Sequence, residues 1–260
     1  MNIVNSVFPV YKPNNVYTRQ LLRWIQLTLD FEKQFQEKKC QKINFKSIDF
    51  TVKPRIEPIF SGVSICGIGI ASKYCKLHLY WDCYHLIKCK LGIMTDSNSI
   101  DGTIIGQKPF DHITSQSLES VCKSLVGDIE LHNPKWFWGK HYDWDGEADA
   151  LIPLSLFTCR DCKVIDFSPP HFTIKTITTN GLPIRSFVNE LGLRLNSYAS
   201  IEECEMFKFG PFTYEDCPKP YELHFTYISD ACNKYNKICV TELMKFSHLK
   251  PDLLKSHKIK

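Results

Sequence analysis

The sequence predicts an α+β fold, a mainly antiparallel sheet packed by about three helices as a single compact unit. One observation is that three segments carry apolar residues every three or four positions, as helices do, and a second is that several short segments alternate apolar and polar residues, as strands do. The chain of 260 residues is also long enough to bury a substantial core. Its 43% hydrophobic and 23% charged residues match an ordinary globular protein, which argues against a disordered chain.

Three helices are expected from the helical spacing of apolar residues. The first covers residues 16–37, and its wide apolar stripe predicts that it is well buried. The second covers residues 115–127, with Thr114 or Ser115 as the N-cap. The third begins at Pro183, which suits a first helical turn, and is expected to stop at Gly192.

Strands are expected where short apolar runs alternate or are bounded by turn residues. Between the first two helices they suggest an antiparallel meander, followed by a long loop at 95–111. Near the C-terminus, Leu223, Phe225 and Tyr227 alternate as a strand, with a hairpin partner around Ile238 and Val240. The other expected strands lie at 59–70, 77–81, 84–91, 150–158, 163–167 and 172–178.

The sequence shows no internal repeat and predicts one domain over residues 16–250. Residues 1–15 contain two prolines and four asparagines and are expected to form an extended N-terminal arm. Residues 251–260 form a basic tail that is expected to fray.

Charge and cysteine content narrow the class of protein. The net charge of +4 is too small for a nucleic-acid coat but leaves room for a local basic patch. Residues 1–10 lack the apolar core of a secretory signal, and no apolar run reaches the roughly 18 residues of a membrane helix. The twelve cysteines are therefore predicted to be reduced thiols in a cytoplasmic protein.

The stretch from His132 to Lys163 is the densest in chemically distinctive residues. It contains three of the five tryptophans, which are Trp136, Trp138 and Trp144. If these rings are buried, they form a structural plug in the core. If they are partly exposed, they are typical of a binding anchor, and Lys140 and His141 would supply a polar rim.

The same stretch suggests a catalytic alternative. Asp161 and Lys163 are two positions apart and would share one face of a strand, and Asp149 precedes Asp161 by twelve positions. This spacing resembles the Asp…(Asp/Glu)-x-Lys core of the PD-(D/E)xK nucleases. The resemblance implies that the two carboxylates hold a Mg or Mn ion and that the lysine helps to activate water.

Other metal and redox sites fit the sequence less well. The acidic alternation that begins at Asp143 fails the EF-hand pattern, because Gly146 and Leu154 occupy the wrong loop positions. Cys159 and Cys162 form a single Cys-x-x-Cys, whereas structural zinc needs four ligands. A zinc site is therefore not expected, and a redox site is disfavoured because a strand rather than a helix follows the pair.

These observations favour a non-catalytic soluble interaction protein, such as an inhibitor or immunity-type factor. It would bind a surface of a protein or of a protein–nucleic-acid complex through Trp136, Trp138, Lys140, His141 and Trp144, without a cofactor or a membrane. The chain is expected not to be an enzyme, and the alternative is the metal-dependent nuclease with Asp149, Asp161 and Lys163. The sequence leaves the partner and the oligomeric state open.

Overall fold

The computed structural model describes residues 5–36, 48–132, 154–218 and 223–249, and of residues 31–36, 132 and 154 it describes the backbone alone. The chain divides into two compact units, with one boundary after Trp81 and the other within strand β10 (Ala199–Phe209). Unit 1 comprises Met1–Trp81 and Met206–Lys260, and unit 2 comprises Asp82–Glu205. None of the helices in these ranges is long and apolar enough to cross a membrane.

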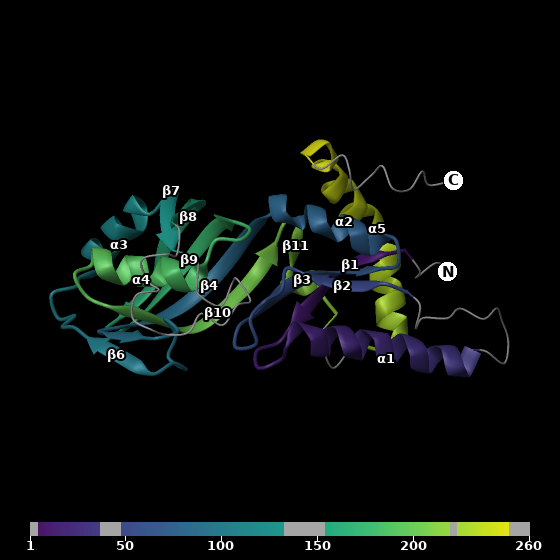
Figure 1. Cartoon of the computed structure of the whole chain (residues 1–260), viewed down its shortest axis with the longest axis horizontal. Helices are drawn as coiled ribbons and strands as arrows, with labels where there is room; N and C mark the ends of the chain where they lie inside the picture. The colour runs from purple at the N-terminus through teal and green to yellow at the C-terminus, as the bar shows by residue number, and fades with distance from the viewer. Residues whose placement is uncertain (1–4, 37–47, 133–153, 219–222, 250–260) are drawn as a thin grey trace. The chain divides into compact units, whose positions relative to one another are not determined.

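Unit 1 is built around three antiparallel strands. Strands β1 and β2 both pair with β3, and almost every residue of β1 and β3 is buried. Helix α1 lies alongside β2 and contacts it (Figure 1). The elements are β1 (Val7–Lys12), α1 (Thr18–Gln36), β2 (Phe50–Lys53), β3 (Ser61–Ile68), α2 (Ala71–Tyr74), the 3-10 helix η2 (Cys75–Tyr80), the end of β10, β11 (Phe212–Thr213), η5 (Tyr214–Asp216), α5 (Phe225–Met244) and η7 (Ser247–Leu249).

Unit 2 is an antiparallel sheet in which β4, β9, β8 and β7 pair in that order. Residues of β4 and β9 alternate between buried and accessible, so one face of the sheet is covered. Helix α3 contacts β8, and helix α4 contacts β7. The elements are β4 (Asp82–Leu91), the hairpin of β5 (Ile93–Thr95) and β6 (Ile104–Gln107), α3 (Ser115–Ser124), β7 (Gly127–His132), β8 (Leu154–Ser168), β9 (His171–Thr179), α4 (Ile184–Arg194) and most of β10.

The predicted α+β class with a mainly antiparallel sheet is confirmed, and the predicted number of helices is too low. The described ranges contain five α-helices, among them the three expected ones and α5. The prediction of a C-terminal hairpin is wrong, because Phe225–Met244 forms helix α5. The alternation that begins at Leu223 is short, and a longer helical pattern follows it. In α5 the buried residues Ile228, Cys232, Tyr235, Cys239 and Leu243 recur every three or four positions.

Other segments also differ from expectation, and most of the expected strand at 77–81 forms the 3-10 helix η2 instead. The expected arm supplies β1, and the expected loop at 95–111 contains the β5–β6 hairpin. Gly192 does not stop α4; a Cβ there would lie 2.4 Å from the Ala199 backbone nitrogen, so glycine permits close packing of α4 on β10. The chain contains two compact units by the contacts between its residues. Whether residues 16–250 fold as a single domain stays a prediction.

Candidate functional site

The aromatic anchor and part of the nuclease site lie outside the described residues. This applies to Trp136, Trp138, Lys140, His141, Trp144 and Asp149. On β8, the Lys163 ammonium lies 2.9 Å from the Asp161 carboxylate, so these two groups pair with each other on an accessible part of the strand. Nowhere in the described ranges do three histidine, cysteine or acidic side chains gather so as to hold a metal ion.

In unit 1, a buried lysine anchors the loop between β2 and β3. Lys12 is the last residue of β1, and no part of it is exposed. Its ammonium donates hydrogen bonds to the carbonyl oxygens of Pro13 and Pro58, each at 2.9 Å, and to that of Phe60. Burial lowers the pKa of Lys12 to about 8, and the negative charge of Glu57 opposes this shift. The lysine therefore ties β1 to both sides of the Pro58–Phe60 turn.

The same loop presents Glu57 on a fixed backbone. The carbonyl of Ile56, just before it, accepts a hydrogen bond of 3.1 Å from the Thr18 hydroxyl on α1. The carbonyl of Pro58, just after it, accepts the bond from Lys12. Glu57 is only partly buried, and both neighbouring peptide groups are held. Such an arrangement is suited to a carboxylate that must meet a substrate in a fixed position.

In unit 2, a buried arginine organises a turn that carries a second carboxylate. Arg185, in the first turn of α4, is 7% exposed, and its guanidinium donates a 2.7 Å hydrogen bond to the Ser97 carbonyl. The same group lies 3.8 Å from the Asp101 carboxylate, which is about half exposed. Within the turn, the Thr95 hydroxyl donates to the Ser99 carbonyl at 2.7 Å. Asp101 is thus a second acidic group held beside a fixed cation.

The covered face of the unit 2 sheet contains polar groups of a different kind. Burial lowers the pKa of His85 on β4 to about 4, so its imidazole is neutral near pH 7. It pairs across the strands with Thr176 on β9. The His85 Nδ1 and the hydroxyls of Thr176 and Thr178 are buried without a hydrogen-bond partner in the described part of the chain. A histidine this far from its ordinary pKa is poorly suited to act as a general base at neutral pH.

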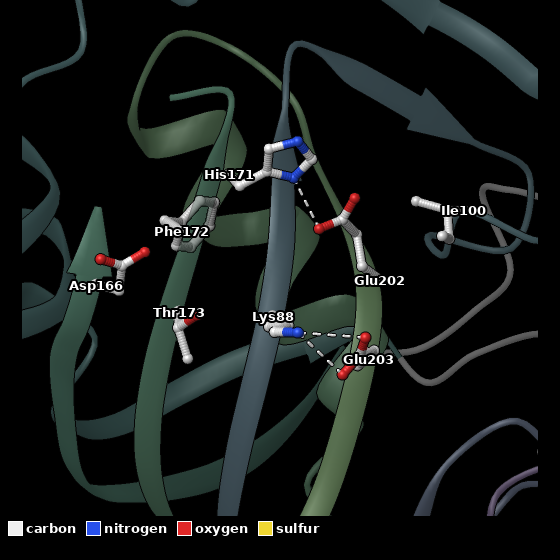
Figure 2. A pocket seen from close by; sticks show the side chains of 8 residues that line it. All are labelled: Lys88, Ile100, Asp166, His171, Phe172, Thr173, Glu202 and Glu203. Atoms are coloured by element: carbon white, nitrogen blue, oxygen red, sulfur yellow. Dashed lines mark hydrogen bonds and ion pairs between the residues drawn. The ribbon is translucent and has the colours of Figure 1, made fainter. Parts of the chain in front are cut away.

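A shallow cavity of about 310 Å³ lies on unit 2 (Figure 2). His171 Nδ1 and the Glu202 carboxylate point toward one another at 2.9 Å, and Lys88 lies 3.3 Å from the Glu203 carboxylate. Both glutamates therefore already have partners. The cavity is therefore bordered by two such side-chain pairs. It is lined by Lys88, Ile100, Asp166, His171, Phe172, Thr173, Glu202 and Glu203.

Comparisons with known proteins point to one class of enzyme. The chain is 26% identical over 218 residues to the pseudouridylate synthase TRUB1 of Mus musculus, covering 81% of this chain. It is 24% identical over 214 residues to the tRNA pseudouridine synthase B of Parabacteroides distasonis, covering 80% of this chain and 90% of that protein. This chain resembles pseudouridine synthases. It spans 64% of the length of the mouse TRUB1, and no family model matches it.

The fold of this chain also resembles the folds of solved structures. The chain superimposes on a crystal structure of a Cbf5-Nop10-Gar1 complex with a TM-score of 0.63, at 17% identity, covering 88% of this chain and 57% of that chain. A structure of an H/ACA RNP bound to a substrate RNA gives a TM-score of 0.60 at 15% identity, covering 88% of this chain and 56% of that chain.

The similarity to pseudouridine synthases corrects the functional expectations drawn from the sequence. The expected non-catalytic inhibitor or immunity-type factor is wrong, because the relatives are RNA-modifying enzymes. The nuclease alternative is wrong for the same reason. The binding role of the Trp136–Trp144 segment stays a prediction, whereas the roles of Asp149, Asp161 and Lys163 applied only to the nuclease.

Sequence reasoning overlooked Lys12, Glu57 and Arg185. The one local signal was the pair of prolines around Glu57, Pro54 and Pro58, which stiffen the loop. Nothing in the sequence indicates that Lys12 is buried, because its carbonyl partner Pro58 is 46 positions away.

Proposed function

We propose that this chain isomerises uridine to pseudouridine within RNA. The observation that carries the proposal is its similarity to pseudouridine synthases over about four fifths of its length. The likeness of its fold to that of Cbf5 supports the same conclusion. The proposed partner is therefore an RNA or an RNA–protein complex, which narrows the protein or protein–nucleic-acid complex expected from the sequence.

The proposed reaction is an internal rearrangement. The bond between N1 of the base and C1′ of the ribose breaks, and a bond between C5 and C1′ forms. The proton on C5 is lost and N1 gains a proton, so that the product has the same atoms as the substrate. No electron pair leaves the nucleoside and no group is transferred, so the balance of the reaction requires no cofactor.

Breaking a glycosidic bond develops positive charge at C1′. A carboxylate can stabilise that charge or attack the carbon, as in glycoside hydrolysis. We assign this role to Glu57, because the loop that carries it is anchored on both sides and the residue is only partly buried. Asp101 is the second candidate, because the buried Arg185 lies 3.8 Å from it.

Tritium release tests this assignment. An RNA transcript labelled with tritium at C5 of uridine should lose the label to water as the new bond forms. Glu57→Gln should lower the rate at least about 100-fold, since the amide keeps the shape of the side chain but lacks its charge. Asp230→Asn, an exposed change on α5 in the same unit, is the matched control and should leave the rate unchanged.

The outcomes separate the candidates. If Glu57→Gln is folded and fully active while Asp101→Asn is inactive, the carboxylate is Asp101. If the wild-type chain releases no tritium from any uridine-containing RNA, the proposed function is wrong.

A reducing compartment such as the cytoplasm is part of the proposal. All eleven cysteines in the described ranges are free thiols, and all are buried. Free cysteines are typical of such compartments. Imaging of a tagged chain would test this placement.

A further inference from the structure

One side of α1 exposes arginines and aromatic rings together. We call this surface the α1 outer face and define it as Tyr17, Arg19, Gln20, Arg23, Trp24 and Leu27. All six are exposed, with Tyr17 at 51%, Trp24 at 39% and Leu27 at 46%. The opposite side of the helix is fully buried at Leu21, Ile25 and Leu29. The helix is therefore amphipathic in an unusual way, because two large aromatic rings lie on its solvent side.

The helical spacing makes these residues one continuous surface. Arg19 and Arg23 are four positions apart, as are Gln20 and Trp24, while Trp24 and Leu27 are three apart. Residues at these spacings are neighbours on a helix. Tyr17 adjoins them, since the Arg19 guanidinium lies 5.3 Å from the centre of its ring.

Among the described residues, the two arginines of this face have no acidic side chain as an ion-pair partner. Two like charges four positions apart repel each other on a helix. Within α1 itself, the first acidic residue is Asp30, seven positions after Arg23. An external anion would relieve this repulsion.

We infer that the α1 outer face binds RNA, with Arg19 and Arg23 contacting phosphates and with Trp24 and Tyr17 stacking on unpaired bases. Arginine and exposed aromatic side chains in one groove or face are the combination that single-stranded nucleic acids recognise. A protein partner would also accept the aromatic rings, but it would not explain two adjacent arginines that have no acidic partner among the described residues. The inference rests on the proposed function, since it places part of the RNA that the proposed enzyme would modify.

Equilibrium binding tests the inference without requiring turnover. The probe is a fluorescently labelled RNA stem-loop with uridine in its loop, followed by anisotropy at several salt concentrations. Each phosphate contact to a single strand contributes about 0.7 to the slope of log affinity against log salt. Arg19→Ala/Arg23→Ala should therefore weaken binding and reduce that slope by about 1.4. Trp24→Ala should weaken binding at least about fivefold and leave the slope unchanged.

The matched control removes two cations elsewhere in unit 1. Lys234→Ala/Lys237→Ala changes the net charge of α5 by the same amount at exposed positions, and it should leave the salt slope as in the wild type. All substituted side chains are exposed, so thermal melting should show that each variant is folded.

Several results would overturn the inference. Wild-type affinity and slope in Arg19→Ala/Arg23→Ala would do so, as would an equal loss in the lysine control or a wild-type chain that binds no RNA. If Trp24→Ala changes only the self-association of the chain, the face is a protein interface instead. The proposed function fails separately: a chain that binds RNA through this face but releases no tritium supports the inference and refutes the enzyme.

Discussion

Lys12 is the residue on which the geometry of the candidate site depends most. Its replacement by methionine keeps most of the length of the side chain but leaves the carbonyls of Pro13, Pro58 and Phe60 without their donor. We expect Lys12→Met to lower the free energy of unfolding by about 2–4 kcal/mol and to lower the catalytic rate through movement of Glu57. Urea denaturation measures the first effect, and Lys76→Met, an exposed change in the same unit, is the control.

The difference in unfolding free energy between the wild type and Lys12→Met should depend on pH, which gives a separate test. The pKa of Lys12 is about 8 in the folded chain and near its ordinary value of 10.5 when unfolded. Between these values the unfolded chain holds a proton that the folded chain has released, so the folded state gains stability as pH rises. The unfolding free energy of the wild type should therefore increase relative to Lys12→Met between about pH 8 and pH 10.5. A difference that is flat over this range would contradict the burial of the ammonium.

The sequence could not predict the burial of charged residues whose partners are distant along the chain. A lysine at the end of a strand is ordinarily exposed, and the partners that bury Lys12 come from a distant loop. The burial of Arg185 could not be predicted either, because the Ser97 carbonyl to which it donates is 88 positions away. In contrast, the apolar stripe of α1 is local, and its buried members Leu21, Ile25 and Leu29 could be predicted from spacing alone.

Helix α3 is the element whose start the sequence predicts best. Thr114 accepts a 3.2 Å hydrogen bond from the Ser117 backbone amide, and the Ser117 hydroxyl accepts one of 2.9 Å from the Thr114 amide. We expect Thr114→Ala to lower the local stability of α3 by about 1 kcal/mol, because one amide of the first turn loses its acceptor. Hydrogen exchange of the α3 amides measures this effect. Ser115→Ala, also exposed and one position away, should change exchange little, and equal effects of the two changes would refute the assigned cap.

Other elements show where short patterns mislead. Leu77, Leu79 and Trp81 alternate as a strand would, yet Cys75–Tyr80 forms a 3-10 helix. Three alternating residues are too few to outweigh tertiary packing, and the same holds for Leu223, Phe225 and Tyr227 at the start of α5. Longer alternations, as in β4 and β9, were predicted correctly because a whole covered face imposes them.

At the scale of the whole molecule, the function could not be predicted from a motif. The candidate carboxylates Glu57 and Asp101 belong to different units and lie in loops without a distinctive spacing. The short pattern around Asp161 predicted a nuclease, and the cluster of tryptophans predicted a binding anchor. The proposed function rests instead on a low similarity over much of the chain, which is 26% identical over 218 residues to mouse TRUB1.

The most direct test of the proposed function is the chemical identity of the nucleoside after reaction. The wild-type chain is incubated with unmodified RNA, the RNA is digested to nucleosides, and these are separated and analysed by mass spectrometry. We predict an isomer of uridine with the same mass, whose fragmentation keeps the base attached to the sugar through a carbon–carbon bond. Unchanged uridine, or free uracil with an abasic RNA, would contradict the proposal.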